Sequence, residues 1–141
     1  MSGIANLKLI GLDSNLFIYH FENNPDFISL TVKVFERLSK GTLRATTSII
    51  SVIETLSYPA PSSVIKNIQE AFATIPNLNI LDVDHKIAFE AAKIRREYKF
   101  RLPDSIQLAT TLVSRTQAFI TNDQKLKPFK KVPIVLLKLQ N

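Results

Sequence analysis

Four acidic residues stand beside apolar segments that are widely separated along the chain: Asp13, Glu54, Asp104 and Asp123. Mg²⁺ prefers oxygen ligands in octahedral geometry, keeps several waters and takes only a few carboxylates directly. Without a cation, several carboxylates held close together would repel one another and raise the pKa of at least one of them. If the fold gathers these residues, they therefore predict a site for Mg²⁺ or Mn²⁺, with one or two ions.

Such a site is suited to the cleavage of phosphodiester bonds. A bound ion lowers the pKa of a coordinated water, which becomes the nucleophile, and a second ion can stabilise the leaving oxygen. The chain carries 18 Lys and Arg against 12 Asp and Glu, and the resulting net charge of +6 favours an anionic partner such as nucleic acid. Solvated surface lysines explain this charge equally well.

Helix capping is the alternative role for the three aspartates, because Asp is a preferred N-cap and its charge complements the helix dipole. Asp104, which follows a proline, would be an obvious cap. Glu54 differs because it is the only charged residue between positions 46 and 64. A carboxylate in so apolar a segment is costly unless it is paired, protonated or metal-bound. Its alternative is to point to solvent from a narrow polar edge shared with Thr47 and Ser51.

Two predicted strands position the first and last of these acids. Residues 7–12 form a short apolar run closed by Asp13, and Asp123 closely follows the run 118–121. In open parallel sheets, ligands bind beyond the carboxyl ends of the strands. If these two strands are parallel neighbours, both carboxylates emerge at the same edge of the sheet.

The remaining pattern alternates short apolar runs with segments of helical spacing. It predicts strands at 7–12, 42–46, 78–82, 118–121 and 132–137, and helices at 14–22, 27–40, 47–58, 62–75, 83–100 and 104–116. Parallel neighbours need crossover connections, so the predicted fold is α/β, a three-layer α/β/α sandwich around a mostly parallel five-stranded sheet. With no repeat and no long linker, residues 1–141 are expected to form one domain.

Several classes of site are excluded or disfavoured. The chain has no cysteine, so it contains no disulfide, no thiolate nucleophile and no cysteine-bound metal. His20 and His85 lie outside the acidic motifs and lack metal-binding spacing, which favours structural roles. The first apolar run is too short for a signal peptide, and no run approaches a membrane span. A cytoplasmic protein with no membrane contact is therefore expected.

Four motifs in this order resemble the PIN-domain ribonucleases over nearly the whole chain: LDSNLFIYH, SVIETL, LPDSIQLATTL and ITNDQKL. The size of the chain resembles the VapC toxins of bacterial toxin–antitoxin pairs. This resemblance implies an Mg²⁺/Mn²⁺-dependent endoribonuclease that is the toxin of a type II toxin–antitoxin system. It also implies a small antitoxin as partner and a homodimer.

The resemblance carries over residue by residue to all four acids as the catalytic and metal-binding set: Asp13, Glu54, Asp104 and Asp123. It further implies that Thr121 and Asn122 orient water or phosphate and that Asn15 steadies the first loop. One departure follows the Pro-Asp pair, where the usual pattern reads Ala-Ile-His and this chain reads Ser105-Ile106-Gln107. This departure leaves the four acids of the metal site unchanged. It separates the chain from the common pattern of the toxins, so the RNA target and the inhibitor do not carry over with the resemblance.

Basic residues cluster before Asp104 and after Asp123. The candidates for RNA binding are Arg95, Arg96, Lys99, Arg101, Lys125 and Lys127. A solvated helix face is the alternative for any one of the first group.

Two other functions fit parts of the pattern. A PIN-like RNA- or protein-binding module without catalysis could keep the acids as a relic, although the retention of all four argues against it. A phosphatase or receiver-like domain would also place an aspartate at the first strand end. However, Asp13-Ser14-Asn15 lacks a second acid two residues on, and Glu54 would then have no role.

Overall fold

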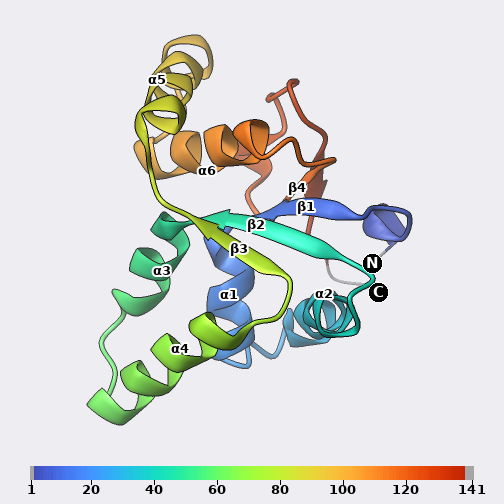
Figure 1. The fold of residues 1–141 in the computed structure, drawn as a ribbon, viewed down its shortest axis with the longest axis vertical. Coiled ribbons are helices and arrows are strands. Elements are labelled where there is room, and N and C mark those ends of the chain that lie inside the picture. Colours follow the sequence, from blue (N-terminus) through green and yellow to red (C-terminus); the bar gives the residue numbers. More distant parts are fainter. Residues whose placement is uncertain (1, 139–141) are drawn as a thin grey trace.

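The computed structural model of the chain describes residues 2–138. Its centre is a sheet in which every strand pairing is parallel (Figure 1). The strands are β1 (Leu9–Leu12), β2 (Arg44–Ser48), β3 (Leu78–Leu81), β4 (Phe119–Thr121) and β5 (Ile134–Leu136), in the order β3-β2-β1-β4-β5. The predicted pairing of the strands that precede Asp13 and Asp123 is confirmed, because β1 and β4 are parallel neighbours.

Helices cover both faces of this sheet, which confirms the predicted three layers. They are α1 (Ser14–Phe21), α2 (Ile28–Lys40), α3 (Ile49–Leu56), α4 (Ser62–Thr74), α5 (His85–Tyr98) and α6 (Leu102–Val113). Figure 1 shows α1 to α4 on one side of the sheet and α5 and α6 on the other. Two short 3-10 helices, η1 (Ser2–Ile4) and η2 (Gln124–Leu126), complete the order. Among residues 2–138, no helix combines the length and apolar character that a membrane span requires.

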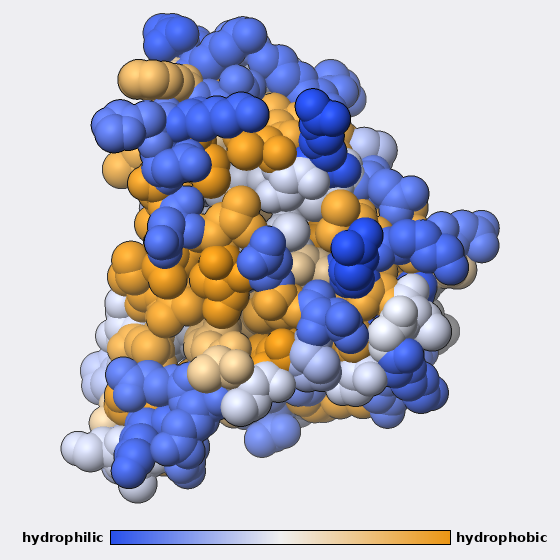
Figure 2. All heavy atoms as spheres, viewed as in Figure 1, coloured by the Kyte–Doolittle hydropathy of each residue, from blue (hydrophilic) through white to orange (hydrophobic). Residues whose placement is uncertain are grey.

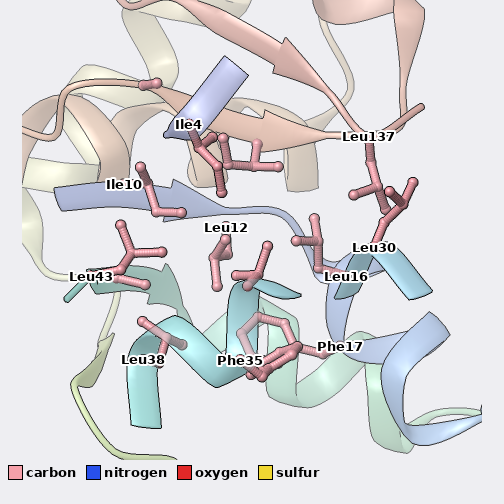
Figure 3. Close-up of a cluster of buried hydrophobic side chains, with 14 of the residues drawn as sticks. Ile4, Ile10, Leu12, Leu16, Phe17, Leu30, Phe35, Leu38, Leu43 and Leu137 are labelled. Carbon is pink, nitrogen blue, oxygen red and sulfur yellow. The ribbon is translucent and has the colours of Figure 1, made fainter. Parts of the chain in front are cut away.

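Alternation along β1 divides the core between the two faces. Ile10 and Leu12 pack with residues of α1 and α2 such as Phe17 and Leu38 (Figure 3). Gly11 lies between them and faces α6, where an added Cβ would collide with the hydroxyl of Thr111. Glycine at this position therefore lets α6 lie directly on the central strand. The close approach carries the first turn of α6 to the edge where β1 ends.

Some predicted boundaries were wrong. The second strand continues to Ser48, where helix 47–58 was predicted to have begun, because its last residues pair with β3. The hydroxyl of Ser48 then caps α3 by accepting a hydrogen bond from the N–H of Ile50 at 3.1 Å. Helix α6 begins at Leu102 and not at Asp104, since Pro103 fits a first turn in which its missing N–H is not needed. Asp104 therefore lies inside this turn instead of capping it.

Candidate active site

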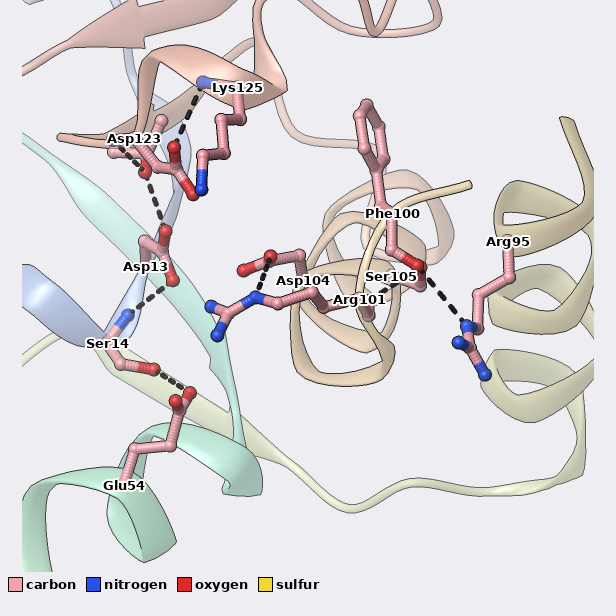
Figure 4. Close-up of polar contacts among 11 residues, drawn as sticks. Asp13, Ser14, Glu54, Arg95, Phe100, Arg101, Asp104, Ser105, Asp123 and Lys125 are labelled. Carbon is pink, nitrogen blue, oxygen red and sulfur yellow. Dashed lines mark hydrogen bonds and ion pairs between the residues drawn. The ribbon is translucent and has the colours of Figure 1, made fainter. Parts of the chain in front are cut away.

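The carboxyl end of the sheet brings the four predicted acids around one space (Figure 4). Asp13 directly follows β1, and its N–H donates to the carbonyl of Ile120 in β4 at 3.0 Å. Asp123 follows β4, Glu54 lies on α3 beyond β2, and Asp104 lies in the first turn of α6. Two strand ends and two helices therefore contribute acids to a single edge.

Asp13 is the most enclosed of the four, with 6% of its surface exposed. One carboxylate oxygen caps α1 by accepting the N–H of Ser14 at 2.8 Å, and the other accepts the hydroxyl of Thr121 at 2.6 Å. The pKa of Asp13 is raised to about 6, chiefly by burial and to a lesser extent by the charges of Asp104 and Glu54, while the hydrogen bonds from Thr121 and Ser14 act to lower it. A nearby cation would relieve this cost of a buried negative charge.

Thr121 connects the first acid to the last. Besides donating to Asp13, its hydroxyl accepts the N–H of Asp123 at 3.1 Å. The side chain of Asp123 in turn caps η2 by accepting the N–H of Lys125 at 2.9 Å. Thr121 is fully buried, so this contact fixes how the two strand ends present their carboxylates.

Glu54 is held from across the edge. The hydroxyl of Ser14 donates to a carboxylate oxygen of Glu54 at 2.6 Å. The polar edge that would have pointed Glu54 to solvent in the alternative role is internal, because Thr47 and Ser51 are both buried and hydrogen-bonded to each other at 2.6 Å. The same helix face therefore turns Glu54 toward Asp13.

Gln107 is the polar residue beneath this contact, and sequence reasoning missed its role and that of Ser14. Its amide nitrogen donates to the hydroxyls of Ser51 at 2.8 Å and Ser14 at 3.2 Å. Its amide oxygen accepts the N–H of Ser48 at 3.3 Å. The signal that could have found it is an uncharged polar side chain inside the apolar run of α6, because buried amides need partners. Gln107 thus supports Ser14, which holds Glu54.

Arg101 lies among the acids. Its Nε donates to Asp104 at 3.1 Å in an ion pair whose side chains are 73% and 12% exposed, respectively. The hydrogen bond to Asp104 raises the pKa of Arg101 first, and the charges of Asp104, Asp123 and Glu54 raise it further. Figure 4 shows the guanidinium directed into the space between the carboxylates.

Of the supporting residues named from the sequence, Thr121 contacts two of the acids, as described above. The side-chain nitrogen of Asn122 donates instead to the hydroxyl of Tyr19 at 2.9 Å. The side-chain oxygen of Asn15 is buried without a hydrogen-bond partner in the described part of the chain. Arg95 donates to the carbonyl of Phe100 at 3.3 Å and so ties the end of α5 to the turn before α6. The remaining basic candidates are exposed: Arg96, Lys99, Lys125 and Lys127.

The chemistry of these donors fits Mg²⁺ or Mn²⁺, because the site offers carboxylate oxygens and no sulfur or imidazole. Their spacing is wider than one ion requires, since within residues 2–138 no three acidic or histidine side chains lie close enough to share a metal. Asp104 is engaged by Arg101 in this arrangement. Side-chain rotation at the edge would therefore accompany metal binding.

Several solved toxin–antitoxin structures share this fold. A chain of VapBC2 from Rickettsia felis bound to a DNA fragment from their promoter is 18% identical with a TM-score of 0.73, covering 92% of this chain and 99% of that chain. A chain of a toxin–antitoxin complex from Klebsiella pneumoniae is 23% identical with a TM-score of 0.67, and the match covers 93% of this chain and 99% of that chain. A chain of DNA-bound VapBC from Salmonella typhimurium is 22% identical with a TM-score of 0.65, and the match covers 94% of this chain and 99% of that chain. At these identities the likeness concerns the fold alone.

The comparison with curated proteins gives no match. A family model described as the PIN domain matches residues 10–134, which is most of the chain. The chain therefore belongs to the PIN domain family.

Proposed function

We propose that this protein is an endoribonuclease that uses Mg²⁺ or Mn²⁺ and acts as the toxin of a type II toxin–antitoxin pair. The observation that carries the proposal is the convergence of four carboxylates from distant segments on the carboxyl end of a parallel sheet: Asp13, Glu54, Asp104 and Asp123. The match to the PIN family over residues 10–134 supports it and supports a single catalytic domain.

In this proposal Asp13, Asp104 and Asp123 hold the metal, and Glu54 is a further ligand or orients water. The bound metal supplies an activated water and stabilises charge on the scissile phosphate. The protein itself orients the carboxylates that would hold the metal. Thr121 fixes the carboxylate of Asp13 at 2.6 Å, and Ser14 fixes that of Glu54 at 2.6 Å. Both contacts hold acids that would otherwise repel one another.

RNA is the proposed substrate because exposed cations flank the acids on both sides. The proposed RNA-binding residues are Arg95, Arg96, Lys99, Arg101, Lys125 and Lys127. Lys125 lies next to Asp123 in Figure 4, on the opposite side of the space from Glu54. Cations in such positions neutralise phosphates and position a nucleic acid without reading its bases.

A small antitoxin is the proposed protein partner, and a homodimer the proposed assembly. The chains of similar fold come from structures described as toxin–antitoxin complexes. Apolar side chains also flank the acids: Ile53 beside Glu54 is 56% exposed, and Leu102 near Asp104 is 53% exposed. Figure 2 shows hydrophobic side chains gathered beside β3, between the regions of α3 and α6. Exposed patches of this kind are typical of protein-binding sites.

Cleavage of RNA by the purified chain tests the proposal. Single-stranded and structured RNA should be cut in Mg²⁺ or Mn²⁺, and EDTA should stop the reaction. Asp13→Asn and Asp104→Asn should each abolish cleavage, while Asp26→Asn, an exposed aspartate outside the site, should not. Cleavage that persists in EDTA or in both variants would refute the proposal. RNA binding without turnover under all metal conditions would favour a non-catalytic module instead.

The toxin role has its own test in cells. Expression of the chain should arrest growth, and coexpression of the product of a neighbouring gene that encodes a short DNA-binding protein should relieve the arrest. Arrest by the Asp13→Asn variant at equal expression would contradict a nuclease origin of the toxicity.

A further inference from the structure

We propose that Arg101 is an internal counter-ion of the acidic site, which occupies Asp104 in the metal-free protein and transfers to an RNA phosphate when a divalent cation binds. The inference rests on the proposed function and extends it by giving one residue two successive partners. Arg101 was a candidate for RNA binding, but its contact with a proposed metal ligand gives it a further role.

The contact geometry carries the first half of this proposal. The guanidinium reaches Asp104 through Nε alone, at 3.1 Å, and this is its one hydrogen bond within residues 2–138. The terminal nitrogens therefore remain available while they point into the space between the carboxylates (Figure 4). The attraction of Asp123 and Glu54 also reaches the guanidinium. A positive charge thus already stands among the acids that a metal would neutralise.

The exposure of the two partners shows which of them can move. The side chain of Arg101 is 73% exposed, whereas that of Asp104 is 12% exposed and anchored in the first turn of α6. An exposed ion pair between residues three apart is weak and is screened by salt. Asp104 therefore stays in place while Arg101 can swing outward at little cost.

Exchange follows because a cation and Arg101 need the same carboxylate. Within residues 2–138 no three acids are gathered closely enough for one ion while Arg101 holds Asp104. Once released, the guanidinium keeps a planar fork of donors that matches a phosphate in a bidentate manner. Its tether at the start of α6 keeps it beside the carboxylates, where the scissile phosphate would lie. Lysine offers a point charge without this fork, so it is not equivalent.

Binding of Mn²⁺ without RNA, measured from the signal of free Mn²⁺ in electron paramagnetic resonance, tests the exchange. Arg101→Gln should bind Mn²⁺ about two- to fivefold more tightly than the natural chain, as expected for loss of an exposed ion pair. Arg115→Gln is the matched control, because it removes the same charge from an exposed position just past the end of α6, at the opposite end of this helix from Asp104. It should leave the Mn²⁺ affinity unchanged at physiological salt.

RNA should respond in the opposite direction. Arg101→Gln should raise the KM for RNA while lowering the Mn²⁺ concentration needed for half-maximal cleavage. Arg101→Lys should retain part of the competition with Mn²⁺ but should not restore the KM. An unfolding midpoint equal to that of the natural chain would show that the fold is intact.

The outcomes separate this inference from the proposed function. Equal or weaker Mn²⁺ binding by Arg101→Gln overturns the inference and leaves the metal site standing. Equal tightening by Arg115→Gln overturns it too, because the loss of any positive charge would then be the cause. Failure of every variant and of the natural chain to bind Mn²⁺ overturns both the inference and the proposed metal site.

Discussion

The hydroxyl of Thr121 donates a 2.6 Å hydrogen bond to the carboxylate of Asp13 across the parallel pair formed by β1 and β4. Both residues are buried, and the same hydroxyl accepts the N–H of Asp123. One side chain therefore relates the orientation of the first acid to that of the last. The sheet alone would bring these strand ends together without fixing how their carboxylates point.

Thr121→Val should destabilise the protein, because Asp13 would keep its buried charge and lose a donor. Hydrogen bonds to charged groups contribute about 1.5–3 kcal/mol, and we expect a loss in the free energy of unfolding at the lower end of this range. Urea unfolding at neutral pH would measure it. Thr110→Val is the control, since that buried hydroxyl donates only to a helix carbonyl. Equal losses in the two variants would argue against a special role for Thr121.

Asp13→Asn should have the opposite effect on the metal-free protein. The asparagine oxygen can still cap α1. The substitution removes a negative charge whose burial is unfavourable, as the raised pKa of Asp13 indicates. With EDTA present we expect the midpoint of thermal unfolding to rise by a few degrees, since ~1 kcal/mol shifts it by about 4 °C in a domain of this size.

The same variant should lose the response to metal. Mg²⁺ or Mn²⁺ should raise the unfolding midpoint of the natural chain, because a ligand that binds the folded state stabilises it. Asp13→Asn should show little or no such rise in parallel melts. A variant that is stabilised by metal as strongly as the natural chain would remove Asp13 from the proposed ligands.

Gln107→Leu should weaken both the fold and the placement of Glu54. Leucine would leave the buried N–H of Ser48 without its partner, which costs about 1–3 kcal/mol. The hydroxyl of Ser51 would lose one donor but keep its hydrogen bond with Thr47. The hydroxyl of Ser14 would lose the hydrogen bond that it accepts from Gln107 and would hold Glu54 less rigidly. We expect a higher metal requirement for cleavage together with lower stability. Loss of stability alone, with the metal requirement unchanged, would restrict Gln107 to a structural role.

The convergence of the strand ends could be predicted because apolar runs and the position of each acid are local properties, and because helices between the strands imply parallel pairing. Asp13 and Asp123 illustrate this, since the parallel pairing of β1 and β4 follows the prediction. The aspartates that were also considered as caps show that the two roles coexist. Asp13 caps α1 and Asp123 caps η2, while both face the other acids. Capping and site formation use different parts of the same carboxylate.

The supporting contacts could not be predicted, because they depend on how distant elements pack. Ser14 and Gln107 are 93 positions apart, and they meet only because α6 lies against the central strands. The end of β2 was likewise set by pairing with β3, which extended the strand through hydroxyl residues that suggested a helix start. The contact of Arg101 with Asp104 is local, because the two residues are three positions apart. This spacing alone does not show whether Arg101 pairs with Asp104 or remains free to bind RNA.

His20 gives the fold a dependence on pH that is separate from the acidic site. Its ring packs on Phe35 with centroids 4.2 Å apart, and Nδ1 lies 3.1 Å from the hydroxyl of Thr31. Burial lowers the pKa of His20 below its ordinary value of 6.5. Protonation therefore favours the unfolded chain, in which the imidazole has its ordinary pKa. The contribution of neutral His20 to stability is complete above pH 6.5 and decreases as the pH falls below it.

His20→Gln should remove this contribution. Gln has no charge to gain, so the free energy of unfolding of the variant should rise relative to that of the natural chain as the pH falls from 7.5 to 5.5, a window of about one unit on each side of the ordinary histidine pKa. Asp13 also titrates in this window, but its contribution is common to both proteins and cancels in the difference. Urea unfolding at several pH values in EDTA would measure both slopes. His85→Gln is the matched control, because His85 is exposed at the start of α5. If His85→Gln produced the same pH-dependent difference from the natural chain as His20→Gln, the burial of His20 would not be its source.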